Sequence, residues 1–319
     1  MKAKKTLAGL ALVGAIALTT AGCAGGGSTA GGGGDDKVIT VGFAQTGSES
    51  GWRSANTESM KTAFSEANGF NLIFNAADNK PEAQIAAVRS FINQGVDAIV
   101  LAPIVTDGWD DVLKEANIPV ILEDRTVSAS EDLYASWVGL DFKKEGETAG
   151  KWVAENFGKT PTNLVVLEGT TGSSAATDRA TGFNDAIKGT DITVLDSQTG
   201  NFTRAEGKTV MEGFLQKYGS QINLLFAHND DMGLGALDAI KAAGLKPGTD
   251  IKIVTIDAVK DGMTALADGE FNYIVECNPL LGEVVKKVVA GESVDKQYIV
   301  EDQAFDQEQA KAALPDRKY

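Results

Sequence analysis

The chain has 319 residues, of which 43% are hydrophobic and 23% are charged, so it is able to bury one or two hydrophobic cores and is not disordered as a whole. Its 44 acidic and 29 basic residues leave a formal charge of −15, which argues against nucleic acid or an anionic membrane surface as a partner. Two cysteines exclude a disulfide scaffold, and a single histidine excludes the common His-rich metal sites.

Residues 1–22 are expected to be an export signal. A basic start, Met1 to Lys5, precedes an uncharged run over residues 6–19 that is too short and too rich in small residues to span a bilayer. Ala21-Gly22-Cys23 resembles the bacterial lipobox, in which the cysteine is lipid-modified and becomes the first residue of the mature chain. Thr20 stands where that motif prefers Leu or Val, so an ordinary secretory signal with an incidental Cys23 is the alternative.

A glycine-rich stretch over residues 23–36 predicts a flexible tether between the lipid and the folded domain, because it has almost no side chains to bury. Cleavage before Cys23 removes Lys2, Lys4 and Lys5 and takes the formal charge from −15 to −18. Cys277 is then left without a disulfide partner. We expect an exported protein that is lipid-anchored on the outer face of the cytoplasmic membrane, or periplasmic.

From Lys37 onward, short aliphatic runs alternate with longer amphipathic stretches. In residues 81–94, for example, Ile85, Val88 and Ile92 recur at helical spacing. Continuous apolar runs separated by helical crossovers predict parallel sheets covered by helices on both faces. The predicted strands form a first set at 38–41, 72–74, 98–101 and 119–122, and a second set at 164–167, 192–195, 224–226, 253–256 and 273–275.

These two sets predict an α/β protein with two doubly wound lobes of similar size. The boundary is placed near Leu140, before a helix-like stretch over residues 143–157. A last helical segment over residues 280–290 follows the second set, and the acidic tail after Gly291 has no clear periodicity. Periodicity alone does not show how often the chain crosses between the lobes.

Polar and aromatic residues follow the predicted strands, where ligands bind in open parallel sheets. Planar Asp, Asn and Arg groups form paired hydrogen bonds to adjacent hydroxyls, and an aromatic face covers the apolar side of a sugar ring. The sequence therefore favours a neutral, polyhydroxylated ligand. The segments concerned are Gly47 to Arg53, Glu123 to Arg125, Gly172 to Arg179, Gly200 to Arg204, His228 to Asp231, Asp257, and Glu276 to Asn278.

Other chemistries match the sequence poorly. Gly42 to Gly47 has the glycine spacing of a P-loop, but Ser48-Glu49 follows where Lys-Ser/Thr is required, and no G-x-G-x-x-G follows the first strand. No G-x-S-x-G nucleophile motif is present either. Asp230 and Asp231 are interpreted as helix caps rather than as metal ligands or catalytic groups. We expect no catalytic residue, no metal and no cofactor.

The segments Gly47 to Arg53, Asp124-Arg125, Asp178-Arg179, Asn201 to Arg204 and Ala227 to Met232 resemble those of the galactofuranose binders within the ribose/galactose-binding branch of ABC-importer solute-binding proteins. The resemblance spans Val38 to Tyr319 and implies a periplasmic binding protein type 1 fold with a multi-strand hinge. It assigns an N-terminal sugar-binding lobe to residues 37–140 and 278–300. The C-terminal sugar-binding lobe takes residues 141–277 and 301–319.

The same resemblance implies a ligand-binding role for particular residues. Trp52 would stack on the sugar ring, and Cys277 occupies a position where ribose-binding relatives have glutamine, so neighbouring Glu276 is expected as the polar contact. The implied ligand-binding set is Glu49, Ser50, Gly51, Trp52, Arg53, Asp124, Arg125, Arg179, Phe202, Asn229, Asp257 and Glu276. Structural alternatives are a hydrophobic plug for Trp52, core packing for Phe202, a salt bridge with Asp124 for Arg125 and a helix cap for Asp257.

The function that the resemblance implies is capture of a monosaccharide by lobe closure and delivery to ABC permease subunits, by a monomer that is not an enzyme. The expected ligand is a furanose similar to galactofuranose. Fructose or another pentose or hexose in the same role, and a sugar sensor for signalling or chemotaxis, are the alternatives. A repressor of the ribose type would need a basic helix-turn-helix before the first strand, where this chain has the signal and the tether.

Overall fold

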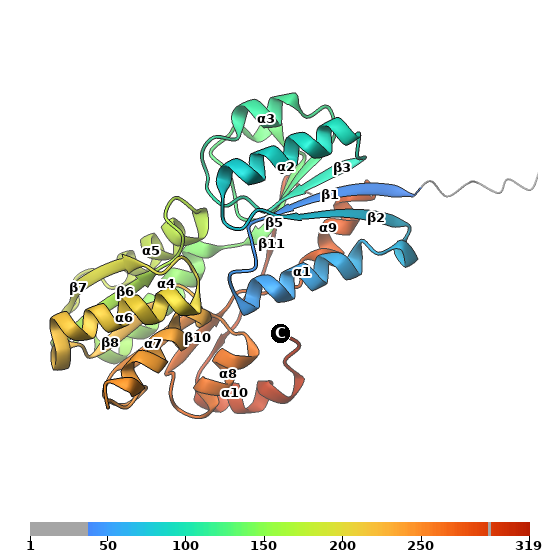
Figure 1. Ribbon diagram of the computed structural model, residues 1–319. Coiled ribbons are helices and arrows are strands. Elements are labelled where there is room, and N and C mark those ends of the chain that lie inside the picture. Colours follow the sequence, from blue (N-terminus) through green and yellow to red (C-terminus); the bar gives the residue numbers. More distant parts are fainter. Residues whose placement is uncertain (1–37, 293–294) are drawn as a thin grey trace, which may run out of the picture. The chain divides into compact units, whose positions relative to one another are not determined.

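The computed structural model describes residues 38–292 and 295–319 (Figure 1). The predicted export signal, the lipid attachment at Cys23 and the tether of residues 23–36 lie outside these ranges. Within the described ranges, no helix combines the length and the apolar character needed to cross a membrane.

The first sheet has six strands in the order β11-β5-β4-β3-β1-β2, and every neighbouring pair is parallel. Alternate residues of its central strand face opposite sides, so that Val100 packs into one hydrophobic cluster while Ile99 and Leu101 pack into another. Helices α1 and α9 supply side chains to the first cluster, and α2 and α3 supply side chains to the second. The elements are β1 (Ile39–Gln45), α1 (Gly51–Ala63), β2 (Phe70–Ala76), α2 (Pro81–Gln94), β3 (Ala98–Leu101), α3 (Asp110–Glu115), β4 (Val120–Asp124), β5 (Ser136–Leu140), α9 (Gly282–Val289) and β11 (Gln297–Val300).

The second sheet also has six strands, in the order β12-β10-β9-β8-β6-β7. All pairs are parallel except the edge pair, in which the two-residue strand β12 runs antiparallel to β10. Its elements are α4 (Phe142–Phe157), β6 (Thr162–Glu168), α5 (Ser174–Ala186), β7 (Ile192–Thr199), α6 (Arg204–Tyr218), β8 (Leu224–Ala227), α7 (Asp230–Ala242), β9 (Lys252–Asp257), α8 (Lys260–Ala267), β10 (Tyr273–Glu276), β12 (Ala304–Phe305) and α10 (Gln307–Ala313).

The chain passes between the sheets three times: after β5, after β10 and after β11. Several crossing segments side by side are what a hinge between two lobes requires. The predicted fold class, two doubly wound α/β lobes joined by a multi-strand hinge, is therefore confirmed. The antiparallel edge strand β12 departs from the purely parallel sheet that the sequence predicts.

Helices α4 and α5 approach each other closely because Gly146 has no side chain. A Cβ atom built at Gly146 would lie 2.1 Å from the carbonyl oxygen of Arg179 on α5. This close packing brings Glu145, next to Gly146, against the Arg179 guanidinium. The local sequence thus positions a buried ion pair beside the cavity described next.

Candidate functional site

A cavity lies at the carboxyl ends of strands from both sheets. The space between its lining residues, open solvent included, is about 290 Å³. Every lining residue ends or follows one of the strands β1 and β4 to β10, in agreement with the general position of ligands in parallel α/β sheets. The lining residues are Glu49, Ser50, Trp52, Arg53, Asp124, Arg125, Phe142, Ala175, Arg179, Phe202, Asn229, Asp257 and Cys277.

The cavity brings together all the predicted ligand-binding residues except Gly51 and Glu276. It adds Phe142, Ala175 and Cys277, which the predicted set does not contain. Phe142 comes just after the end of β5, so the strand-end rule would have found it had that strand been recognised.

Arg53 organises the side of the cavity that belongs to the first sheet. Its buried guanidinium donates through Nη2 to Asp124 Oδ2 at 2.7 Å and through Nε to Glu49 Oε1 at 3.0 Å. Burial alone would lower the pKa of Arg53, but Asp124 and Glu49 raise it above its usual value. Burial alone would raise the pKa of Glu49, but Arg53 and Arg125 outweigh it and hold that pKa below its usual range. These groups form a charged cluster that is already satisfied within the protein.

Arg125, by contrast, is poorly satisfied. Its side chain is buried, yet its nearest acceptors are the Ile104 carbonyl oxygen at 3.4 Å and Asp124 Oδ2 at 3.6 Å. Its Nε has no hydrogen-bond partner among the described residues. Burial lowers the pKa of Arg125, and the neighbouring Arg53 lowers it further. A buried guanidinium without good acceptors costs free energy, so Arg125 is a donor that a ligand hydroxyl would satisfy.

Arg179 anchors the side of the cavity that belongs to the second sheet. Its Nε donates to Glu145 Oε2 at 2.7 Å and its Nη1 to the His228 carbonyl oxygen at 2.6 Å. Its Nη2 lies 3.7 Å from Asp257 Oδ1, too far for a hydrogen bond. Burial raises the pKa of Asp257 well above its usual value, although Arg179 opposes this change. The Asp257 carboxyl lines the cavity, where it is available to a ligand hydroxyl.

The lining contains equal numbers of basic and acidic side chains. Three arginines, at positions 53, 125 and 179, face three carboxyl groups, those of Glu49, Asp124 and Asp257. A site for phosphate or a carboxylate ligand would present an excess of positive charge. The lining instead offers planar donors and acceptors to a ligand without net charge.

Three lining residues have a backbone conformation that non-glycine residues rarely adopt. The φ angles of Asp124, Phe202 and Asp257 are 62°, 62° and 126°. Such conformations cost on the order of 1–3 kcal/mol each and are concentrated at ligand clamps and active sites, where the surrounding structure fixes them. Their coincidence at one cavity indicates a functional site rather than a simple gap in packing.

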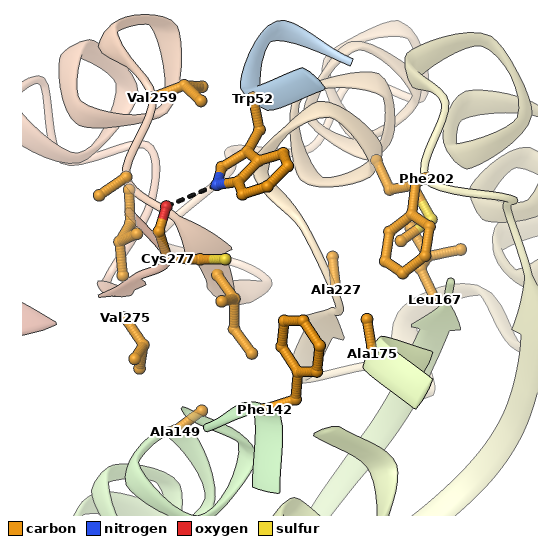
Figure 2. Packing of buried hydrophobic residues seen from close by; sticks show 14 of the residues in the cluster. Trp52, Phe142, Ala149, Leu167, Ala175, Phe202, Ala227, Val259, Val275 and Cys277 are labelled. Atoms are coloured by element: carbon orange, nitrogen blue, oxygen red, sulfur yellow. Dashed lines mark hydrogen bonds between the residues drawn. The ribbon is translucent and has the colours of Figure 1, made fainter. Parts of the chain in front are cut away.

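Trp52 and Phe202 supply aromatic surface from opposite sheets (Figure 2). The indole Nε1 of Trp52 donates to the Cys277 carbonyl oxygen at 2.6 Å, which fixes the ring plane. The ring of Phe202 lies against Gly169, where an added Cβ would be 1.9 Å from the Phe202 Cζ. The Arg125 guanidinium lies 5.1 Å from the centre of the Phe202 ring. Both rings are thus held at the cavity by specific contacts.

Glu276, which is expected to contact the ligand, binds two other groups in this structure. Glu276 does not line the cavity, because its Oε1 accepts from Arg317 Nη1 at 2.7 Å and from the Tyr319 hydroxyl at 2.8 Å. Cys277 lines the cavity in its place. Burial raises the pKa of the Cys277 thiol well above its usual value, so the group facing the cavity is a thiol and not a thiolate.

Asp230 and Asp231 lie in the first turn of α7, at its positive end as expected, but neither is the N-cap residue. Asn229 is the N-cap of α7, and its side chain accepts from the Met232 N–H at 3.0 Å. Asp230 instead accepts from the Val259 N–H at 2.8 Å. Asp231 Oδ2 accepts from the Gly51 N–H of the first sheet's α1 at 2.7 Å. Gly51, although outside the lining, therefore contributes a hydrogen bond between the lobes.

Two further hydrogen bonds join the lobes beside the cavity. The Thr126 N–H donates to Ser174 Oγ at 3.1 Å, and the Thr106 N–H donates to the Gly172 carbonyl oxygen at 2.9 Å. With the Gly51–Asp231 bond they hold the two lobes together around the lining residues. The structure is therefore a closed arrangement in which both lobes share the cavity.

His228 lies beside the site and is fully buried. Its Nδ1 accepts from the Gly169 N–H at 3.3 Å, while its Nε2 has no partner among the described residues. Burial, together with the charge of Arg179, lowers the pKa of His228 to about 3. No group of His, Cys, Asp or Glu side chains within residues 38–292 and 295–319 is arranged to hold a metal ion.

Replacing His228 with glutamine is expected to reduce the loss of stability in acid. The pKa of His228 is lower in the folded chain than in the unfolded chain, so between about pH 3 and 6.5 only the unfolded chain binds a proton at this residue. The free energy of unfolding therefore falls as the pH falls through this window. From pH 7 to pH 5 this histidine should remove about 2 kcal/mol of unfolding free energy. Urea titrations of the wild type and of His228→Gln at pH 7 and pH 5 measure the two losses of unfolding free energy. The contribution of the carboxyl groups is the same in both proteins and cancels when the losses are compared. Equal losses in the two chains would contradict the prediction.

The two lobes, the crossing segments and the shared cavity define a binding protein that encloses a small ligand between two α/β domains. The chain belongs to the periplasmic binding protein family, because the family model for the periplasmic binding protein domain matches residues 41–290. This finding confirms the family resemblance seen in the sequence.

Three relatives show which branch of the family is similar. The galactofuranose-binding protein YtfQ of Escherichia coli (strain K12) is 48% identical over 76% of this chain and 78% of its own length. The fructose import binding protein FruE of Bifidobacterium longum (strain NCC 2705) is 40% identical over 86% of both chains. A solved structure from Mycobacterium smegmatis in complex with β-D-fucofuranose is 57% identical, with a TM-score of 0.84 over 88% of this chain and 95% of that one.

Proposed function

We propose that this protein is the extracytoplasmic solute-binding component of an ABC sugar importer, which captures a monosaccharide by closure of its lobes and delivers it to the permease. The observation that carries the proposal is the cavity itself, in which a guanidinium with an unpartnered Nε, a carboxyl group 3.7 Å from the Arg179 guanidinium and two aromatic rings come from both lobes. A neutral polyol completes these hydrogen bonds and stabilises the closed state, because both lobes then share the ligand. No covalent step is needed.

The favoured ligand is a sugar in furanose form, similar to galactofuranose. The lining offers donors and acceptors for hydroxyl groups from both lobes, together with two aromatic rings. Two of the relatives carry galactofuranose or β-D-fucofuranose in their names, which supports the same ring form here. Fructose is the second candidate, on the strength of the relative that is named for fructose import.

A thermal-shift panel of free sugars tests this proposal. Galactose or fructose should raise the melting temperature of the purified domain, because a ligand that binds only the folded state stabilises it by mass action. Ribose and glucose are the controls for specificity. No shift with any sugar would refute sugar binding, and a strong response to glucose would overturn furanose selectivity.

Replacing Gly169 with alanine is expected to weaken sugar binding by about tenfold, because the new methyl group displaces the Phe202 ring that covers the ligand. Gly213→Ala is the matched control, since a Cβ at this position of α6 meets no atom of the described residues within 4 Å. Isothermal titration calorimetry with the sugar that gives the largest thermal shift measures both variants. Wild-type affinity in Gly169→Ala would contradict the role of Phe202.

We further propose that Cys23 carries a lipid that holds the protein on the outer face of the cytoplasmic membrane, with residues 23–36 as tether. The lipobox-like Ala21-Gly22-Cys23 and the uncharged run before it support this anchoring. Cys23→Ser should move the protein from the membrane fraction to the soluble extracytoplasmic fraction. Retention of the variant in the membrane fraction would refute the lipid anchor.

We also propose that the protein is a monomer with two lobes. We assign residues 37–140 and 278–300 to the first lobe, and residues 141–277 and 301–319 to the second.

A sensor for signalling or chemotaxis would use the same cavity. Loss of sugar uptake in cells that lack the protein supports the import role, because an importer cannot work without its binding component. Unchanged uptake together with a lost transcriptional or chemotactic response would assign the protein to sensing.

A further inference from the structure

Arg317 follows all the cavity-lining residues in the sequence, and its side chain connects the ends of two strands that carry lining residues. Its Nε donates to the Ala258 carbonyl oxygen at 2.6 Å, and its Nη1 donates to Glu276 Oε1 at 2.7 Å. Ala258 directly follows the lining residue Asp257, and Glu276 directly precedes the lining residue Cys277. Arg317 itself does not line the cavity.

The first acceptor belongs to a strained corner. Asp257 and Ala258 have φ angles of 126° and 61°, which non-glycine residues rarely adopt. Strained conformations persist only where the surroundings fix them from several sides. Arg317 holds the Ala258 carbonyl, and Asp230 Oδ2 accepts from the Val259 N–H at 2.8 Å on the other side of the corner. The direction of the Asp257 carboxyl group depends on both contacts.

The second acceptor is linked to Trp52. Glu276 and Asp257 are register partners in β10 and β9, and the Cys277 N–H donates to the Asp257 carbonyl oxygen at 3.2 Å. The Cys277 carbonyl oxygen in turn accepts from Trp52 Nε1 at 2.6 Å, the bond drawn in Figure 2. A shift of Glu276 would therefore move the acceptor that fixes the indole ring.

We propose that Arg317 is a positioning residue for ligand binding: by tying Ala258 to Glu276, it holds the Asp257 carboxyl group and the Trp52 ring in the geometry that receives the sugar. The inference rests on the proposed function. Tyr319 assists, because its hydroxyl donates to Glu276 Oε1 at 2.8 Å and its ring lies 4.2 Å from the Arg317 guanidinium carbon. If Arg317 only attached the final residues to the domain, its loss would lower stability without changing the affinity of the folded protein.

Arg317→Met is the central variant, because methionine keeps the length of the side chain and removes both hydrogen bonds. Titration calorimetry with D-galactose, D-fructose and L-arabinose should show binding weakened by about tenfold relative to the wild type. The affinity of Arg317→Lys should lie between those of the wild type and Arg317→Met, because a single ammonium group replaces a guanidinium group that donates to two acceptors. Lys311→Met on α10 is the matched control and should bind sugar like the wild type, because Lys311 forms an exposed ion pair with Glu308.

Hydrogen–deuterium exchange without sugar gives a second, ligand-independent measurement. Arg317→Met should exchange faster over residues 255–280 and should be unchanged over the first sheet. Wild-type affinity, or unchanged exchange over residues 255–280, would overturn the inference. If Arg317→Met does not fold, Arg317→Lys and Tyr319→Phe decide by the same two criteria. A wild-type protein that binds none of the three sugars would refute the proposed function instead, and the exchange comparison would still decide whether Arg317 orders the corner.

Discussion

Arg125→Met is expected to weaken sugar binding by at least about thirtyfold, or about 2 kcal/mol, while leaving the free energy of unfolding nearly unchanged. The two effects separate because Arg125 makes poor hydrogen bonds within the protein, with 3.4 Å to Ile104 and no partner for Nε among the described residues. A buried charge with poor hydrogen-bond partners in the protein contributes little to the stability of the fold. It contributes strongly to ligand binding, because the ligand supplies the missing acceptors.

The direction of the pKa of Arg125 supports this separation. Burial and Arg53 lower it, which means that folding makes the charged form of Arg125 less favourable. The folded-state pKa of Arg53 is raised in the same cluster, so that Arg53→Met would lower stability as well as affinity. Removal of Arg125 leaves the Arg53 pairs with Glu49 and Asp124 in place.

Calorimetric titration with the best sugar of the thermal-shift panel and urea unfolding at pH 7 measure the two quantities. Arg89→Met is the control for loss of one arginine, because Arg89 forms an exposed ion pair with Glu115. A stability loss of more than about 2 kcal/mol in Arg125→Met would show that the residue is structural. Unchanged affinity would remove it from the site.

The position of the site was accessible from the sequence for a general reason. In parallel α/β sheets the apolar runs are recognisable, and the ligand lies at their carboxyl ends. Glu49, Asp124, Arg179 and Asp257 all follow such runs and all line the cavity. The fold class follows from the same alternation of strands and helices.

Contacts between segments that are far apart in the sequence cannot be predicted from local sequence patterns. Glu276 also follows an apolar run, but Arg317 and Tyr319 bind its carboxylate, and no local pattern relates these positions. The bond between Asp231 and the Gly51 N–H likewise joins different lobes. Strand β12 is only two residues long and therefore has no periodicity to detect.

The order of strands was equally hidden. A repeating strand and helix pattern looks the same whichever sheet a strand joins, so the return of β11 to the first sheet cannot be predicted from periodicity. The family resemblance implied this crossing where the residues alone did not. The sequence does not predict strand β5, because Ser-Trp-Val-Gly-Leu is not a continuous aliphatic run. Phe142 is missed for the same reason, since it follows that strand.

Arg179→Met is expected to lower the free energy of unfolding by about 3 kcal/mol and to weaken sugar binding by at least about a hundredfold. Unlike Arg125, Arg179 has strong bonds to Glu145 and to the His228 carbonyl oxygen, at 2.7 and 2.6 Å. Its removal leaves the fully buried Glu145 without its counter-charge. Burial already raises the pKa of Glu145 while Arg179 opposes that effect, so the variant should raise it further.

The pH dependence of this stability loss has a definite sign. A carboxyl group whose folded-state pKa is raised destabilises the fold as the pH rises through the range between its unfolded and folded values, and the penalty disappears when it is protonated. The deficit of Arg179→Met should therefore be smaller at pH 5 than at pH 8. Urea titrations at both pH values measure it.

A double-mutant cycle separates the two roles of Arg179. In Arg179→Met/Glu145→Met the buried charge is gone and apolar side chains of similar size replace the pair, so most of the lost stability should return. Affinity should not return, because the donor that holds the ligand side of the second lobe is still missing. Recovery of sugar binding along with stability would mean that Arg179 acts only through the packing of α4 against α5, and not on the ligand.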